Sequence, residues 1–288
     1  MSSPGSPDMP VPDKQGLVLR VGLYVLLAWV GLLLFPGILL PLGGILVTST
    51  LSTFAAAAVA NAVVVRIYER GRLADVGLAG TPSAGREFLM GAAGGVGAVM
   101  CVVLIPVVLR MADFQPAPER VDHPWAAFAF SGVAIFFGAM GEELLFRGYA
   151  FQLLIRSIGP FSTILPTSVI FGLMHSWNPN ATGMGIVNTV TWGVLLGFTV
   201  WRTEALWLAI GLHFGWNITL PLLGSNLSGF TMGVTGYALK WKVGVLWSGG
   251  SYGVEGSVLT TLIVVVLLFA VHKLIPQLQV TEPEVTER

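Results

Sequence analysis

The sequence predicts an all-α polytopic membrane protein, a bundle of about eight transmembrane helices. Hydrophobic residues make up 54% of the 288 residues and charged residues only 10%, whereas soluble domains carry about 25% charged residues. Mean hydropathy is correspondingly high, at +0.79. Two stretches of 45 residues, 21–65 and 157–201, contain no Asp, Glu, Lys or Arg. A membrane-spanning helix needs about 20 apolar residues, so each stretch is long enough for two spans.

The first half of the chain provides four of the expected spans. The first uncharged stretch divides into two helices at Pro36–Gly44, where residues that interrupt helices are concentrated. A third span is expected from Phe88 to Leu109. A fourth begins near Trp125 and continues unbroken to about Arg156, because no Pro intervenes and a Gly-Pro turn signal follows only later.

The second half of the chain provides the other four. The second uncharged stretch divides at the polar insert Ser176–Asn180 into the fifth and sixth spans. The seventh is expected at Ala205–Leu223 and the eighth at Gly256–Val271, which is short for a membrane span.

The chain is expected to form a single transmembrane domain, residues 17–275, with its motif-bearing core at 125–223. Residues 1–16 are rich in Pro, Ser and Gly, and residues 276–288 form an acidic tail, so both are expected to be disordered. With the N-terminus inside, eleven of the 15 Lys and Arg residues fall on the cytoplasmic side. This bias predicts that both termini are cytoplasmic.

Charge and cysteine content exclude several classes of function. A formal net charge of zero argues against nucleic acid as a partner. The single cysteine, Cys101, leaves no internal disulfide and no thiolate metal cluster. We find no Gly-rich phosphate loop and no Ser-based nucleophile elbow in the sequence.

Three charges lie within the expected fourth span, in the stretch GEELLFRG. Glu143 and Arg147 are four residues apart on one helix face, a spacing that suits an ion pair, and their role is either catalytic or the fixing of helix packing. Glu142 points about 100° away and has no obvious partner on its own helix. An unpaired carboxylate in a membrane span is costly and often marks function. Glu142 is therefore the first candidate for a general base or acid.

Two histidines and an amide are expected at a similar depth. His175 ends the fifth span, while His213 and Asn217 share one face of the seventh. At a rise of 1.5 Å per residue, these three groups and Glu142 fall within a band of about 10 Å. Convergence of polar groups from separate helices is typical of sites in bundle cores.

A carboxylate with two imidazoles fits two kinds of hydrolytic site. In a metal-free site, Glu142 and His175 polarise a water while His213 and Asn217 stabilise the oxyanion. In a metal site, Glu142, His175 and His213 hold a divalent ion such as zinc, with Asn217 as a further ligand or orienting donor. Spacing does not choose between the two.

These residues resemble the CPBP intramembrane proteases, the family that includes the CAAX prenyl endopeptidase and the bacterial bacteriocin-immunity (Abi) proteins. The motifs of that family, EExxxR, FxxxH and HxxxN or HxxxD, occur here in order as Glu142-Glu143-x-x-x-Arg147, Phe171-x-x-x-His175 and His213-x-x-x-Asn217. Three motifs in order are far more specific than any one of them. The resemblance implies an intramembrane endopeptidase whose active site lies in the helix core of an eight-helix bundle.

The resemblance also implies roles for single residues. Glu142 would activate water beside His175, and His213 and Asn217 would act as oxyanion or metal partners. Glu143 and Arg147 would support the site by holding their helix in register. The Gly-rich segment 224–256, expected outside the membrane, is either a flexible connector or a loop that contacts substrate.

The implied substrate is a peptide or protein that is lipidated or embedded in membrane lipid. Candidates are a prenylated CAAX peptide, a peptide pheromone, a bacteriocin or a sorting-signal protein, and a prokaryotic plasma membrane is the expected location. The main alternative is a catalytically silent scaffold or bacteriocin self-immunity protein of the same fold. A transporter with a proton relay is disfavoured, because few further polar residues mark a continuous path through the spans.

Overall fold

The computed structural model describes residues 11–118 and 122–275, and most of them are helical, as predicted. The α-helices are α1 (Lys14–Tyr68), α2 (Ala84–Val108), α3 (Pro124–Arg147), α4 (Tyr149–Ile158), α5 (Pro160–Met174), α6 (Gly183–Thr203), α7 (Trp207–Leu222), α8 (Val245–Ser248) and α9 (Val258–Leu274). Short 3-10 helices are η1 (Leu73–Val76), η2 (His175–Trp177), η3 (Gly250–Tyr252) and η4 (Val254–Gly256), and the strands are β1 (Ala112–Pro116) and β2 (Tyr237–Trp241). Helix α1 begins within the segment predicted as an N-terminal tail; residues 1–10 and 276–288 lie outside the described part of the chain.

Within the part of the chain that the structure describes, five helical segments are long and apolar enough to cross a membrane, which makes this a multi-pass membrane protein. They are Lys14–Pro41, Gly44–Tyr68, Ala84–Val108, Pro124–Ile158 and Gly183–Thr203. The expected count of eight spans is not confirmed, because three of the predicted helices are short. Helices α5, α7 and α9 have 15, 16 and 17 residues, whereas a straight span needs about 20.

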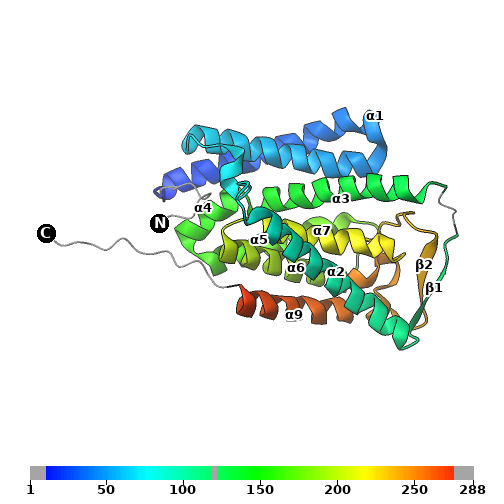
Figure 1. Ribbon diagram of the computed structural model, residues 1–288. Coiled ribbons are helices and arrows are strands. Elements are labelled where there is room, and N and C mark those ends of the chain that lie inside the picture. Colours follow the sequence, from blue (N-terminus) through cyan, green and yellow to red (C-terminus); the bar gives the residue numbers. More distant parts are fainter. Residues whose placement is uncertain (1–10, 119–121, 276–288) are drawn as a thin grey trace.

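The break predicted within the first uncharged stretch is confirmed at Gly44. Its φ of 69° and ψ of −169° are not helical, so α1 consists of two arms. The arms lie antiparallel along one side of the bundle (Figure 1). The second arm packs on α3 at Gly141, where an added Cβ would lie 2.6 Å from the backbone nitrogen of Phe54.

The prediction of an unbroken fourth helix is wrong, because the chain breaks at Gly148, between α3 and α4. The buried side chain of Asn61, from α1, occupies the break. Its amide nitrogen donates to the Leu144 carbonyl at 3.0 Å, and its oxygen accepts from the Tyr149 backbone N–H at 2.7 Å. A Cβ on Gly148 would lie 2.3 Å from that oxygen, so only glycine fits here. The hydroxyl of Tyr24 donates to the Leu144 carbonyl as well, at 3.1 Å.

Helices α2 and α7 cross in close contact (Figure 1), and each presents glycines to the other. A Cβ on Gly91 or Gly95 would lie 2.2 or 2.3 Å from a backbone oxygen of α7. A Cβ on Gly211 or Gly215 would lie equally close to a backbone oxygen of α2. Small residues four apart allow this close backbone approach between membrane helices. The contact fixes the position of α7, the helix that carries two of the predicted site residues.

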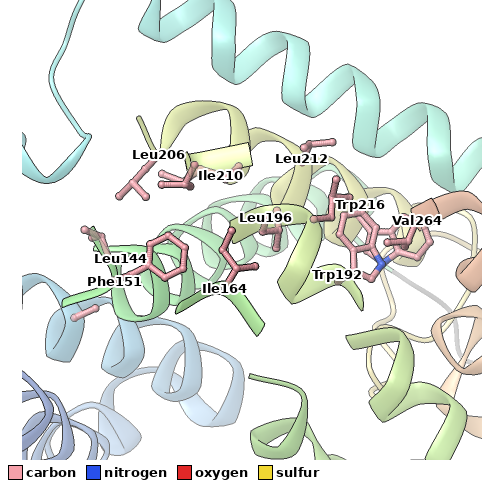
Figure 2. Packing of buried hydrophobic residues seen from close by; sticks show 14 of the residues in the cluster. Leu144, Phe151, Ile164, Trp192, Leu196, Leu206, Ile210, Leu212, Trp216 and Val264 are labelled. Atoms are coloured by element: carbon pink, nitrogen blue, oxygen red, sulfur yellow. The ribbon is translucent and has the colours of Figure 1, made fainter. Parts of the chain in front are cut away.

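The interior of the bundle is filled by apolar side chains from several helices. Figure 2 shows Trp192 and Leu196 of α6 against Ile210 and Trp216 of α7, with Val264 of α9 beside them. The indole rings of Trp192 and Trp216 lie 4.9 Å apart between centroids.

The all-α prediction missed one small sheet. Strands β1 and β2 pair antiparallel, with Ala112 opposite Trp241, at one end of the bundle (Figure 1). Strand β2 belongs to the Gly-rich segment 224–256, so part of that segment has regular structure.

Candidate active site

The last turns of α3 place Glu143 and Arg147 in the interior, where their side chains are 0% and 2% exposed. The guanidinium donates to Glu143 Oε1 at 3.3 Å and to the Gly193 carbonyl of α6 at 3.2 Å. The Phe171 ring of α5 covers the guanidinium carbon at 4.6 Å. The pair expected from the spacing of four is therefore present, and it joins α3 to α5 and α6.

Glu143 also contacts His213 of α7. Its Oε1 lies 2.9 Å from His213 Nδ1. Because a carboxylate only accepts, Nδ1 carries the hydrogen and the other ring nitrogen, Nε2, is left to face Glu142. A carboxylate that orients an imidazole in this way fixes both its tautomer and its ring plane.

His175 is oriented by the backbone of its own helix. Its Nδ1 lies 2.8 Å from the Phe171 carbonyl, four residues earlier. A carbonyl accepts only, so Nδ1 carries the hydrogen, and in the neutral ring Nε2 presents a lone pair. The FxxxH spacing thus has two physical functions here: the Phe171 carbonyl orients the histidine, and the Phe171 ring covers Arg147.

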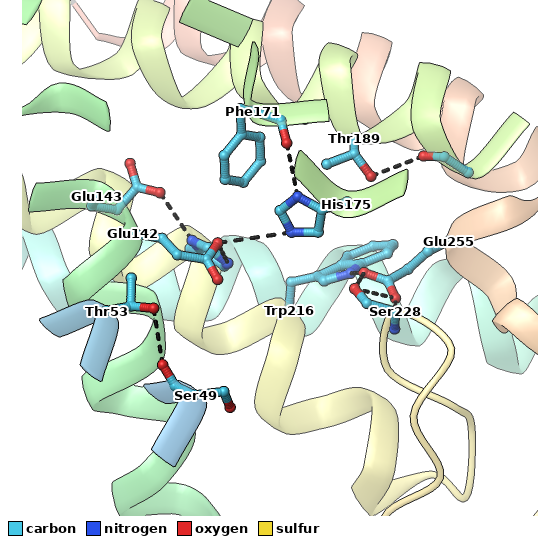
Figure 3. A network of polar contacts seen from close by, with 12 residues as sticks. Ser49, Thr53, Glu142, Glu143, Phe171, His175, Thr189, Trp216, Ser228 and Glu255 are labelled. Atoms are coloured by element: carbon cyan, nitrogen blue, oxygen red, sulfur yellow. Dashed lines mark hydrogen bonds and ion pairs between the residues drawn. The ribbon is translucent and has the colours of Figure 1, made fainter. Parts of the chain in front are cut away.

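One carboxylate oxygen of Glu142 lies near both histidines, and Figure 3 shows its contact with His175. This oxygen, Oε2, is 3.9 Å from His175 Nε2 and 3.7 Å from His213 Nε2. Both separations are too long for direct hydrogen bonds. The oxygen is buried and has no hydrogen-bond partner among the described residues. One water at about 2.8 Å from Glu142 Oε2 could donate one hydrogen to that oxygen and the other to the Nε2 of one histidine.

These groups line a cavity of about 750 Å³ within the bundle. Asn217 lies on its wall one turn after His213, so the predicted shared face of α7 is confirmed. The rest of the wall is largely apolar and includes Leu46 of α1, Phe146 of α3 and Met174 of α5. The structure therefore brings the four predicted polar groups to the wall of one cavity.

The same groups do not form a ready metal site. Zinc ligands lie about 2.0–2.2 Å from the ion, which places tetrahedral ligand atoms about 3.3–3.6 Å from each other. The observed 3.7 and 3.9 Å are slightly longer. Within residues 11–118 and 122–275, no group of three or more His, Cys, Asp or Glu side chains is arranged to hold a metal ion. We therefore derive no catalytic step through a metal.

Sequence reasoning missed several polar residues that support the site. Asn61 holds the helix break that follows Arg147. Glu255, from the Gly-rich segment, lines the same cavity and accepts hydrogen bonds from Trp216 and Ser228. A lone Asn within an uncharged span and a lone Glu in a loop carry no spacing signal, so only the folded structure identifies them.

Comparison with known protein families agrees with this geometry. Residues 124–219 match the model of the type II CAAX prenyl endopeptidase Rce1-like family. This region of the chain is therefore similar to the Rce1-like family. This match confirms the resemblance drawn from the three motifs, and it spans every motif residue from Glu142 to Asn217. Helices α1, α2 and α9 lie outside the matched Rce1-like region, although α1 contributes to the cavity wall. No curated protein and no solved structure matched the chain.

Proposed function

We propose that this protein is an intramembrane endopeptidase that hydrolyses a peptide bond of a membrane-associated substrate. One observation carries the proposal: a buried carboxylate oxygen of Glu142, without a hydrogen-bond partner among the described residues, lies within 4 Å of two imidazole nitrogens on a cavity wall. The similarity of residues 124–219 to the Rce1-like family model supports the same reaction class.

Water activation follows from the hydrogen-bonding capacity of each group. The water donates one hydrogen to Glu142 Oε2 and the other to the lone pair of His175 Nε2. Its oxygen attacks the carbonyl carbon of the substrate, and the proton released passes to Glu142. Because Phe171 holds the hydrogen of His175 on Nδ1, the attacking geometry is set before substrate binds.

Two residues of α7, His213 and Asn217, would stabilise the tetrahedral intermediate. The Asn217 amide can donate to the oxyanion directly. His213 can donate from Nε2 only when both ring nitrogens carry hydrogen, because Nδ1–H is already held by Glu143. Glu143 and Arg147 thus act as supporting residues. The intermediate collapses when the C–N bond breaks, and Glu142 returns its proton to the leaving amine nitrogen.

The cavity suits an extended peptide that carries apolar groups. Its wall is largely apolar and is formed partly by α1, which contributes Leu32, Ile45 and Leu46 as well as the hydroxyls of Ser49 and Thr53. A lipidated or membrane-embedded peptide matches this lining better than a soluble, charged one. Prenylated CAAX peptides, peptide pheromones, bacteriocins and sorting-signal proteins are the classes to be tested.

The direct test is cleavage of lipidated and transmembrane peptide libraries by the purified full chain in detergent, with Glu142→Gln as the variant. This change preserves shape and removes the base, so we expect at least about a hundredfold loss of kcat. Glu87→Gln, a partly buried carboxylate on α2, is the matched control and should leave cleavage unchanged. Full cleavage by Glu142→Gln would exclude the mechanism.

Adding a strong chelator to the same assay tests whether cleavage requires a metal ion. In the metal-dependent version, Glu142, His175 and His213 would hold a divalent ion such as zinc, and a strong chelator would abolish cleavage until the ion is restored. The metal-free proposal expects cleavage to be unaffected. If the wild type cleaves no peptide but binds one with an affinity that Glu142→Gln does not change, the protein is a scaffold or immunity protein of this fold.

A further inference from the structure

A third carboxylate, Glu255 of η4, lies at the wall of the same cavity. In the view of Figure 3 it is on the opposite side of His175 from Glu142. Its Oε1 accepts from the indole Nε1 of Trp216 at 3.2 Å. Its Oε2 accepts from the Ser228 backbone N–H and from the Ser228 hydroxyl, the latter at 3.1 Å. Both oxygens are thus used in contacts to two other parts of the chain.

One of these parts is the segment 227–233, which lines the cavity and lies outside the Rce1-like match. Its backbone is held in a strained form, because Ser228 has a φ of 48° and Gly229 a φ of 86°. A residue other than glycine is rarely left-handed, and such a conformation persists only where its surroundings enforce it. Two backbone hydrogen bonds between Leu227 and Phe230, at 2.8 and 2.9 Å, close this turn, and the hydrogen bonds to Glu255 add side-chain contacts that hold Ser228 within it.

The segment 227–233 also abuts the chain just after His175. A Cβ on Gly229 would lie 1.7 Å from the carbonyl oxygen of Pro179, four residues beyond that histidine. The Gly229 N–H donates to the Tyr252 carbonyl at 2.9 Å. Gly229 is therefore closely packed between η3 and the turn that follows η2, whereas Phe230 and Thr231 beyond it are exposed.

The other part is Trp216 of α7, which lies between His213 and Asn217 in the sequence. Its ring packs on Trp192 and lines the cavity. The Glu255 carboxylate accepts a hydrogen bond from the indole N–H of Trp216. The backbone carbonyl of Glu255 accepts another from the Asn188 side chain of α6, at 2.8 Å. A single residue thus connects α6, α7 and segment 227–233 at one end of the cavity.

We propose that Glu255 is a positioning residue that holds segment 227–233 and Trp216 as one wall of the cavity beside His175, and so determines how tightly the peptide residues next to the scissile bond are bound. The proposal rests on the proposed peptidase function. It assigns no bond-making step to Glu255, because both of its oxygens are used as acceptors within the protein.

The kinetic test compares Glu255→Gln with the wild type in the peptide assay. Glutamine keeps the volume but replaces one acceptor oxygen with an NH₂ group, which then faces the N–H and O–H donors of its neighbours. We expect KM to rise about five- to tenfold while kcat stays within about twofold, the pattern for an interaction that binds substrate and transition state equally. Ser228→Ala keeps the backbone N–H and removes only the hydroxyl, so a smaller rise in KM is expected. Glu87→Gln again serves as the control.

A second measurement does not depend on cleavage. Amide hydrogen exchange of segment 227–233 should be at least about tenfold faster in Glu255→Gln than in the wild type, and unchanged in Glu87→Gln. Unaltered exchange and unaltered KM would overturn the inference, as would a fall in kcat without a change in KM. If the wild type cleaves nothing, the proposed function fails and the exchange data alone decide the role of Glu255. If Glu255→Gln does not fold, Ser228→Ala supplies both measurements.

Discussion

Replacing Asn61 with alanine tests whether the helix break at Gly148 holds the catalytic end of α3 in place. The change removes the acceptor of the Tyr149 N–H, which lies 2.7 Å from the Asn61 side-chain oxygen in a buried position. The Leu144 carbonyl loses one donor but keeps the Tyr24 hydroxyl at 3.1 Å. Asn61→Ala therefore leaves one buried group, the Tyr149 backbone N–H, without its hydrogen-bond acceptor.

The cost of that orphaned N–H can be bounded from two sides. A buried unsatisfied donor costs about 1–3 kcal/mol. Interhelical hydrogen bonds in membranes contribute less, at most about 1.7 kcal/mol, because the unfolded state in the bilayer finds other partners. We expect Asn61→Ala to lower the free energy of unfolding by about 1–1.7 kcal/mol, measured in mixed detergent and SDS micelles. The matched control is Ser52→Ala on the same arm of α1, since the Ser52 hydroxyl is buried without a hydrogen-bond partner among the described residues and should cost close to nothing.

The same variant has a functional readout. Glu142 lies on the helix that ends at this break. Loss of the Asn61 hydrogen bonds should therefore let the end of α3 shift and move the carboxylate away from the two histidines. A displacement of about 1 Å costs up to about a hundredfold in rate, so we expect kcat to fall about 10- to 100-fold with little change in KM. If Asn61→Ala matched Ser52→Ala in both stability and kcat, the break would be a consequence of the glycine alone and our reasoning would be refuted.

Two further predictions concern the packing of α3 and the small sheet. Gly141→Ala should lower stability by about 1–3 kcal/mol and reduce kcat, because its Cβ would lie 2.6 Å from a backbone nitrogen of α1 and would push the neighbouring Glu142 away. Gly138→Ala, whose Cβ would meet only a threonine methyl at 3.0 Å, should cost less, and equal losses in unfolding assays would contradict the steric argument. For the sheet, the hydrogen bond from Lys242 lowers the pKa of Asp113. The stabilisation by Asp113 is thus fully present above its ordinary pKa of about 4 and is lost as pH falls through the lowered value. The difference in unfolding midpoint between wild type and Asp113→Asn should therefore shrink between pH 6 and pH 3, and a constant difference would count against the pair.

The sequence was sufficient to predict that Glu142, His175, His213 and Asn217 would lie close together, because each belongs to a short motif on a single helix. In EExxxR, FxxxH and HxxxN, a spacing of four places two residues on one face of the same helix. The rise per residue then predicts that the polar groups of the three helices lie at a similar depth in the membrane. Where the fold depends on contacts between distant segments, the prediction failed. The break at Gly148 is produced by Asn61, which belongs to another helix and carries no local signal. Glu255 likewise acquires its role only because Trp216 and Ser228 lie against it.

The predicted count of eight spans is unconfirmed for a related reason. Composition distinguishes apolar from polar segments, but not a helix that crosses the bilayer alone from one that is enclosed by its neighbours. Helices α5 and α7 are short for independent spans, yet α7 is largely buried by the remaining helices. Such helices need less length, because the protein rather than the lipid surrounds their ends.

Steric contacts of glycine explain how three helices keep a carboxylate and two imidazoles in register. Each helix has a glycine within three residues of its polar cavity residue, at which a neighbour approaches too closely for any side chain: Gly141 before Glu142, Gly172 before His175, and Gly211 and Gly215 around His213. A hydrogen bond between membrane helices contributes little energy and can be exchanged for another. At these glycines an added Cβ would lie 2.2–2.6 Å from an atom of the next helix. Sliding a helix by one residue would put a side chain there and cause a clash. The polar groups of the site therefore need not hold the helices together, and Glu142 can keep an oxygen free for water.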